Sequence, residues 1–151
     1  MKENKTIREV KIENNTLQFL FRGAIENDIS CNTGSAYVTN TYFSSEYPNS
    51  AEIERALENI EIEFSKHKEL RNNNETLICN NSVLAEMLSV EEETVISRNI
   101  LEEVFNKYID CACGEPAHIL GIDYSVEKLS LIILVRTIMY YLGFNEITVS
   151  K

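Results

Sequence analysis

The pattern of apolar and polar positions is clearest near the end of the sequence, in the range Ser125–Val149. Apolar side chains there recur nearly all the way around a helix, which is typical of a central helix rather than a surface one. Ser125 is a good N-cap, and Gly143 supplies the left-handed residue that ends many helices. The apolar run is interrupted at Arg136 and is shorter than the roughly 20 residues that a membrane span needs. We therefore predict a buried helix, followed by a short strand at Glu146–Val149 that returns to the same core.

The N-terminal part of the chain shows the two-residue alternation of β-strands. Leu17, Phe19 and Phe21 fall on one face, and Asn14–Asn15 tolerate the positive φ angles of a tight hairpin turn. Residues 1–8 are highly charged, and we expect them to be frayed. The predicted strands of this antiparallel meander are Val10–Glu13, Thr16–Ile25, Ile29–Cys31 and Ala36–Phe43.

Two capping boxes predict helices in the middle of the chain. Asn49 with Glu52 opens a helix whose apolar stripe runs from Ile53 to Phe64. Ser89 with Glu92 predicts a second, long helix that ends at Gly114 and Pro116. Between these two helices we expect a short buried strand at Thr76–Cys79 and a short helix at Ser82–Leu88.

The order of these elements predicts the fold class. Strands come first, and helices dominate the rest, which favours an α+β protein over an alternating α/β one. We expect a small N-terminal antiparallel sheet packed with about four helices, the central apolar helix and the final strand. At 151 residues the chain fits a single domain, residues 1–151, with a substantial core.

Charge and cysteine content narrow the function classes. The formal net charge of −10 disfavours nonspecific binding to nucleic acids or anionic membranes, and it suits a basic partner. A soluble protein with no such partner carries the same signature. The N-terminus lacks the apolar segment of a signal peptide, so we expect a cytoplasmic protein with reduced thiols. Homo-oligomerisation is compatible with the sequence.

One short segment contains a cluster of metal-binding residue types. Cys111, Cys113 and His118 could hold a soft divalent metal. However, zinc knuckles usually separate paired cysteines by two to four residues, whereas one residue separates this pair. Two cysteines near a helix end more often fill small gaps in the packing. We therefore predict no metal and no other cofactor, and we keep these three residues as the metal candidates.

Two further patterns have an ordinary structural explanation. The segment Asn32–Ser35 could present backbone amides to a phosphate, but it lacks the lysine of a P-loop, and we interpret it as a turn between strands. The segment Leu84–Val95 resembles a helix-turn-helix motif. Its would-be recognition helix opens with three glutamates, Glu91–Glu93, which would face phosphates with like charges, so we expect a helical corner that does not bind DNA.

No catalytic arrangement can be assembled from the sequence. The two histidines, His67 and His118, lie in no recognisable motif, and we expect His67 to be exposed near a helix end. The acidic residues are concentrated in two predicted helical segments, which would be solvated faces in the simplest interpretation. Our functional hypothesis is a non-catalytic protein that binds a basic macromolecular partner, in the manner of inhibitors, immunity proteins or antitoxins. The alternative is a small-molecule-binding or catalytic α+β domain with a thiolate and histidine metal site. The partner-binding residues of the main hypothesis are Glu54, Glu58, Glu61, Glu91, Glu92 and Glu93.

Overall fold

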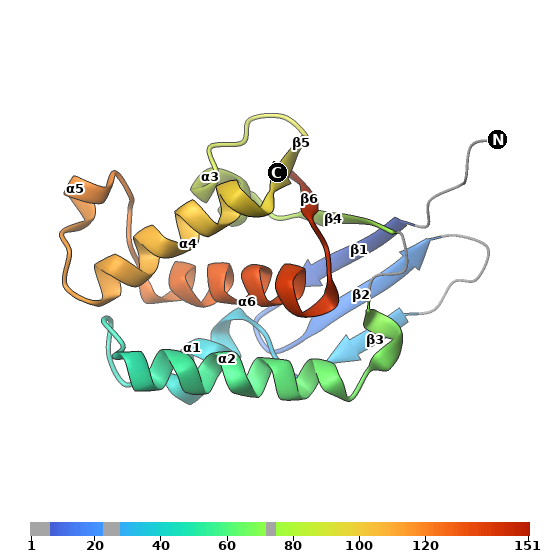
Figure 1. Cartoon of the computed structure of the whole chain (residues 1–151), viewed down its shortest axis with the longest axis horizontal. Helices are drawn as coiled ribbons and strands as arrows, with labels where there is room; N and C mark the ends of the chain where they lie inside the picture. The colour runs from blue at the N-terminus through green and yellow to red at the C-terminus, as the bar shows by residue number, and fades with distance from the viewer. Residues whose placement is uncertain (1–6, 23–27, 72–74) are drawn as a thin grey trace.

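A mixed sheet forms one side of the molecule and a group of helices forms the other (Figure 1). The computed structural model describes residues 7–22, 28–71 and 75–151. Within these ranges six strands pair in the order β3-β2-β1-β4-β6-β5. The strands are β1 (Ile7–Ile12), β2 (Leu17–Arg22), β3 (Asp28–Cys31), β4 (Thr76–Asn80), β5 (Thr94–Ser97) and β6 (Glu146–Ser150).

The sheet combines both kinds of strand pairing. Strands β1, β2 and β3 form an antiparallel meander, while β4 runs parallel to β1 and β6 runs parallel to β4. Buried residues alternate along the strands, as in Leu17 and Phe19 of β2 or Ile147 and Val149 of β6. One face of the sheet therefore packs against the helices.

The helices surround the apolar C-terminal helix α6 (Val126–Leu142), which Figure 1 shows between α4 on one side and α1 and α2 on the other. Ser125 accepts a hydrogen bond from the Lys128 amide as N-cap, and Gly143 ends the helix at φ 84°. Both predicted caps and the burial of this helix are confirmed. The remaining helices are α1 (Ser35–Tyr42), α2 (Ser50–Ser65), the 3-10 turn η1 (Lys68–Leu70), α3 (Ser82–Met87), α4 (Arg98–Ala112) and α5 (Ala117–Leu120).

The predicted α+β class is confirmed, as are the Asn49–Glu52 capping box of α2, the strand β4, the short helix α3 and the final strand. The sheet is larger than the predicted N-terminal meander because β4, β5 and β6 extend it, and six helices replace about four in the described ranges. None of the helices in these ranges is both long enough and apolar enough to cross a membrane.

The predicted strand Ala36–Phe43 is wrong, since this segment forms helix α1. Its β-branched and aromatic residues favour a strand locally, but tertiary contacts override that preference. The amides of Ser35 and Tyr37 donate to the carbonyls of Glu13 and Asn14 in the β1–β2 turn, at 3.1 and 2.8 Å. The turn thus supplies the hydrogen-bond acceptors that the first turn of a helix needs.

The capping box predicted at Ser89 is also wrong. Ser89 adopts φ 57° just beyond the end of α3, and the residues after it form strand β5 along the edge of β6. The long helix begins later, with Ser97 as the N-cap that accepts from the Ile100 amide. The segment Leu84–Val95 therefore does not continue into a second helix, and the helix-turn-helix resemblance fails.

Of the N-terminal residues predicted to be frayed, Met1–Thr6 lie outside the described residues, whereas Ile7 and Arg8 belong to β1. Arg8 is almost fully buried, with 1% of its surface exposed. The end of the predicted strand Thr16–Ile25, residues 23–25, also lies outside the described residues.

Candidate functional site

The C-terminal end of α2 turns sharply into η1 and places several cationic side chains in a short stretch. The His67 amide donates to the carbonyl of Phe64, and the Leu70 amide donates to that of His67. Leu70 is buried and anchors this turn to the core. The sequence from Lys66 to Arg71 carries two lysines, one histidine and one arginine within six residues, in a chain whose net charge is −10.

Arg8, in strand β1, holds η1 against the sheet. Its guanidinium donates to the backbone carbonyls of Leu70 and Glu69, and it pairs with the Glu75 carboxylate through Nε at 3.1 Å. It also lies over the ring of Phe21, with 4.3 Å between Cζ and the ring centroid. Burial lowers the pKa of Arg8, although the Glu75 carboxylate opposes this effect. A buried, hydrogen-bonded arginine thus fixes the position of the cationic turn.

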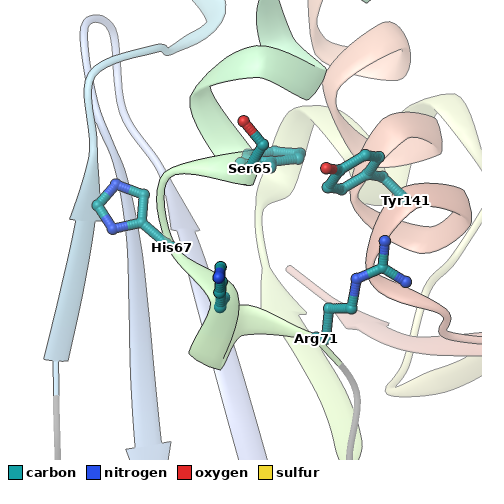
Figure 2. Close-up of a pocket in the computed structure, with 6 residues that line it drawn as sticks. Ser65, His67, Arg71 and Tyr141 are labelled. Atoms are coloured by element: carbon teal, nitrogen blue, oxygen red, sulfur yellow. The ribbon is translucent and has the colours of Figure 1, made fainter.

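A pocket of about 340 Å³ opens beside this turn, which is within the size range of small-molecule sites. The guanidinium of Arg71 lies 5.3 Å from the ring centroid of Tyr141, at the end of α6. Figure 2 shows these two side chains facing each other on one side of the pocket, with Ser65 above them and His67 on the opposite side of the chain, toward the strands. The lining residues are Phe64, Ser65, His67, Lys68, Arg71 and Tyr141.

The charge of this pocket suits an anion. Lys68 and Arg71 contribute positive charge, and no carboxylate lines the pocket in the described part of the chain. An acidic depression, lined by Glu58 and Glu61, lies on the other side of Tyr141 and Ser65. The cationic pocket is therefore confined to the η1 side of the Tyr141 ring, where Arg71 stacks on it.

A second group of reactive side chains shares His67 with the pocket. The ligand atoms of Cys31, Glu63 and His67 all lie within 4.8 Å of one another. Glu63 Oε2 accepts from the Asn32 amide at 2.9 Å and lies 3.5 Å from His67 Nε2. Burial by itself would raise the pKa of Glu63, but the Asn32 amide, the Lys66 ammonium and His67 outweigh burial, so its pKa lies below the ordinary value.

The structure does not bring the predicted metal candidates together. Cys111 is buried in α4, Cys113 is exposed just after it, and His118 is exposed in α5. Among the described residues, Cys31, Glu63 and His67 form the one group of three that lies close enough to share a metal ion. His67 is half-buried, so the prediction that it is exposed is wrong.

The predicted partner-binding glutamates lie in two different settings. Glu54, Glu58 and Glu61 are exposed on α2, as expected. Glu91–Glu93 are exposed in the loop between α3 and β5, so the second acidic segment is not a helical face. Binding of a basic partner at these carboxylates stays a prediction.

The turn Asn32–Ser35 connects β3 to α1 instead of connecting two strands. The amides of Ser35 and Tyr37 at the start of α1 already donate to the β1–β2 turn, and the Asn32 amide donates to Glu63. Within the turn itself, the amides of Asn32 and Ser35 therefore already have protein acceptors, which leaves fewer of its donors for a phosphate.

A second pocket lies at the carboxyl ends of the parallel strands β4 and β6, a position where ligands of open sheets often bind. There, Glu91 and Glu86 line a pocket of about 410 Å³ together with Lys151, and the Lys151 ammonium lies 3.3 Å from Glu91. Two carboxylates against one ammonium make this pocket less favourable for an anion than the pocket beside η1.

Sequence reasoning missed the cationic pocket and the Cys31 group. The basic residues between Lys66 and Arg71, interrupted by Glu69 and Leu70, were a usable signal for the pocket in a strongly acidic chain. The Cys31 group was not visible, because its residues come from positions 31, 63 and 67 and meet only through the packing of α2 against the sheet.

Comparison with known proteins identifies the fold. No protein-family model matches the sequence, and no curated protein matches it. Among solved structures, the Aquifex aeolicus Ppx/GppA phosphatase, type II variant, superimposes with a TM-score of 0.77 at 15% identity, covering 100% of this chain and 55% of that one. An exopolyphosphatase from Cytophaga hutchinsonii gives 0.63 at 13% identity, covering 99% of this chain and 54% of that one. An exopolyphosphatase-like protein gives 0.72 at 11% identity, covering 96% of this chain and 55% of that one.

These likenesses correct our functional hypothesis. The entire chain has the fold of about half of each of these enzymes. The hypothesis of a non-catalytic, inhibitor-like protein, together with the expectation that it is not an enzyme, is therefore wrong. The alternative of a small-molecule-binding or catalytic α+β domain agrees better with this fold.

Proposed function

We propose that this chain is a phosphatase-type domain that binds a condensed phosphate, such as polyphosphate, in the cationic pocket beside η1. Two observations together carry the proposal. The fold is shared with Ppx/GppA phosphatases and exopolyphosphatases, and a pocket in this acidic protein is lined by Lys68 and Arg71. The proposed reaction class is hydrolysis of a phosphoanhydride. Water adds to phosphorus, the bridging P–O bond breaks, and the leaving phosphate takes the bonding electron pair and a proton.

The two cations have different parts in the proposed binding. The planar guanidinium of Arg71 can donate two parallel hydrogen bonds to a pair of phosphoryl oxygens, and its stacking on Tyr141 restricts its orientation. The Lys68 ammonium adds a positive charge that can contact a neighbouring phosphoryl group. A linear condensed phosphate offers such neighbouring groups, which makes it a better fit than an isolated phosphate.

The chain corresponds to only part of the enzymes that it resembles, so we propose that it supplies only part of the hydrolytic site. The chain spans about 55% of the Aquifex aeolicus phosphatase. We propose that this domain supplies the phosphate-binding wall and that further groups from another domain or chain complete the hydrolytic site. The four free cysteines suit a reducing compartment, so we also propose a cytoplasmic location.

Calorimetric titration with tripolyphosphate at low ionic strength tests this proposal. We expect the wild-type chain to bind and the double variant Lys68→Met/Arg71→Met to bind at least about tenfold more weakly, which corresponds to about 1.4 kcal/mol. Methionine keeps much of the apolar stem, so the pocket wall is largely preserved while both charges are lost.

The matched control is Lys11→Met/Lys107→Met, which removes the same net charge from two exposed positions that do not line the pocket. We expect this control to bind within about twofold of wild type, because exposed distant charges are screened. Equal weakening in both double variants, or no binding by the wild type, would refute the proposed site.

A further inference from the structure

Three side chains, from β3 and from the end of α2, meet beside the cationic pocket, which His67 also lines. Cys31 ends strand β3, Glu63 lies in the last turn of α2, and His67 follows that helix. Glu63 and His67 are four residues apart and so lie on one face of the helix end. The Asn32 amide, next to Cys31, donates to Glu63 at 2.9 Å and joins the strand to the helix.

From this arrangement we infer that the Cys31 thiolate, the Glu63 carboxylate and the His67 imidazole form a binding site for a zinc ion. Sulfur, nitrogen and carboxylate oxygen are the donor types that zinc takes in proteins, and three protein ligands leave a fourth position for water. A thiolate with an imidazole selects zinc over magnesium or calcium, which prefer oxygen ligands alone.

The distances are compatible with a shared ion. Tetrahedral bonds of roughly 2.0 to 2.3 Å place neighbouring ligand atoms roughly 3.3 to 3.8 Å apart. Glu63 Oε2 and His67 Nε2 lie 3.5 Å apart, and all three ligand atoms fall within 4.8 Å of one another. His67 is more exposed than Glu63 and the fully buried Cys31, so its side chain has the most room to adjust to an ion.

The surrounding groups orient Glu63 and keep the Cys31 thiol protonated until a metal ion binds. The Asn32 amide fixes the Glu63 carboxylate, in the way that outer hydrogen bonds fix metal ligands. Burial raises the pKa of the Cys31 thiol to about 12, with smaller contributions from Glu63 and Glu69. The thiol is therefore protonated without metal, and zinc binding forms the zinc–sulfur bond while releasing this proton to solvent.

One neighbouring cation competes with the metal. The Lys66 ammonium lies 3.1 Å from Glu63 Oε1, but 63% of the Lys66 side chain is exposed, so it can move into solvent when an ion binds. The carboxylates of Glu63 and Glu69 both favour a cation here, and Glu69 acts on Cys31 through its charge. The inference rests on the three ligand atoms and does not require the phosphate-binding proposal.

Cobalt(II) titration of the full chain, freed of metal with a chelator, tests the site through its spectrum. Cobalt bound by a thiolate gives a charge-transfer band in the near ultraviolet, and we expect this band to saturate near one equivalent and to disappear on addition of zinc. Cys31→Ser should remove the band. His67→Gln should weaken cobalt binding by about tenfold or more.

Cys113→Ser is the matched control, because Cys113 is exposed and lies outside the site. It should keep the band, and circular dichroism checks that each variant is folded. If burial makes Cys31→Ser unfold, the half-buried His67→Gln variant still decides the question. A wild-type chain without the band, a band that His67→Gln leaves unchanged, or a band that depends on Cys113 would each overturn the inference.

Discussion

Gly34 is the N-cap of helix α1 and packs closely against the β1–β2 turn. Replacing it with alanine should therefore lower the stability of the protein. A Cβ atom at this position would lie 2.5 Å from the carbonyl oxygen of Glu13 and 2.6 Å from that of Asn14. Real Cβ atoms essentially never approach closer than 3.0 Å, so the turn would have to move by at least about 0.5 Å. The backbone φ of Gly34 is −166°, which any residue can adopt, so the effect comes from crowding and not from backbone strain.

The size of the effect follows from what the displacement breaks. The Ser35 amide donates to Glu13 at 3.1 Å, and the Tyr37 amide donates to Asn14 at 2.8 Å. An outward shift lengthens both hydrogen bonds beyond or close to the usual limit of about 3.2 Å, at a net cost of about 0.5–1.5 kcal/mol each. With an overpacking cost of about 1–3 kcal/mol, and allowing for the reduced entropy of the unfolded chain, we expect a loss of roughly 2–4 kcal/mol.

Thermal unfolding and urea titration of Gly34→Ala measure this loss, which should lower Tm by roughly 5–15 °C for a domain of this size. Gly121→Ala is the comparison, because no atom of the described residues, its chain neighbours apart, lies within 4 Å of its Cβ position, although its φ is +71°. Its cost should be about 1 kcal/mol, from the left-handed backbone alone. A Gly34→Ala chain as stable as wild type, or more stable than Gly121→Ala, would show that the turn is not locked to the helix in this way.

Further predictions concern the core, the pH response and thiol access. Leu134 is fully buried, so Leu134→Ala should cost about 2–5 kcal/mol in urea unfolding, and Leu134→Asp should abolish the cooperative transition; a stable Leu134→Asp chain would contradict the placement of α6. The Asn49 amide, and then the Ser44 donors, hold the pKa of Glu52 below its ordinary value. Its contribution to stability is therefore present above the unfolded-state pKa of about 4.3 and lost as pH falls through the lower folded-state value. In urea unfolding curves recorded at a series of pH values, Glu52→Gln should lose less stability than wild type as the pH falls. An equal loss in both chains would refute the assignment. Iodoacetamide should modify exposed Cys113 in the native chain, as read by mass spectrometry, and should modify Cys79 only after unfolding, because burial raises the pKa of Cys79 to about 12; equal native rates would contradict its burial.

Local signals in the sequence predicted the elements whose ends are determined locally. Ser125, Gly143 and the Asn49–Glu52 box act through hydrogen bonds within a few residues, and the structure uses them as predicted. The all-round apolar pattern of α6 likewise reflects its burial directly.

Elements determined by distant contacts could not be predicted in this way. Helix α1 has strand-like residues and forms because Glu13 and Asn14 accept its first amides. Strand β5 lies in a segment whose Ser89 resembles an N-cap, and it forms because β6 offers an edge for pairing. Both outcomes depend on where remote parts of the chain lie.

The same limit applies to the candidate site. The basic run that ends at Arg71 was present in the sequence, but Tyr141 reaches it only through the packing of α6 against α2. Cys31 and His67 come together only through the packing of α2 against the sheet. The adjacent pair Cys111 and Cys113 gave the stronger signal in the sequence, yet the helix directs one into the protein and leaves the other exposed.

The central claim is that the pocket beside η1 binds condensed phosphate, and mapping of amide chemical shifts by NMR during a tripolyphosphate titration tests it most directly. At 17.3 kDa the chain is well suited to this measurement. We expect the largest saturable shifts at Ser65, Lys68 and Arg71, and no comparable shift at Glu91 or Lys151, which line the pocket at the carboxyl ends of β4 and β6. Shifts concentrated at Glu91 and Lys151, or none that saturate, would contradict the claim.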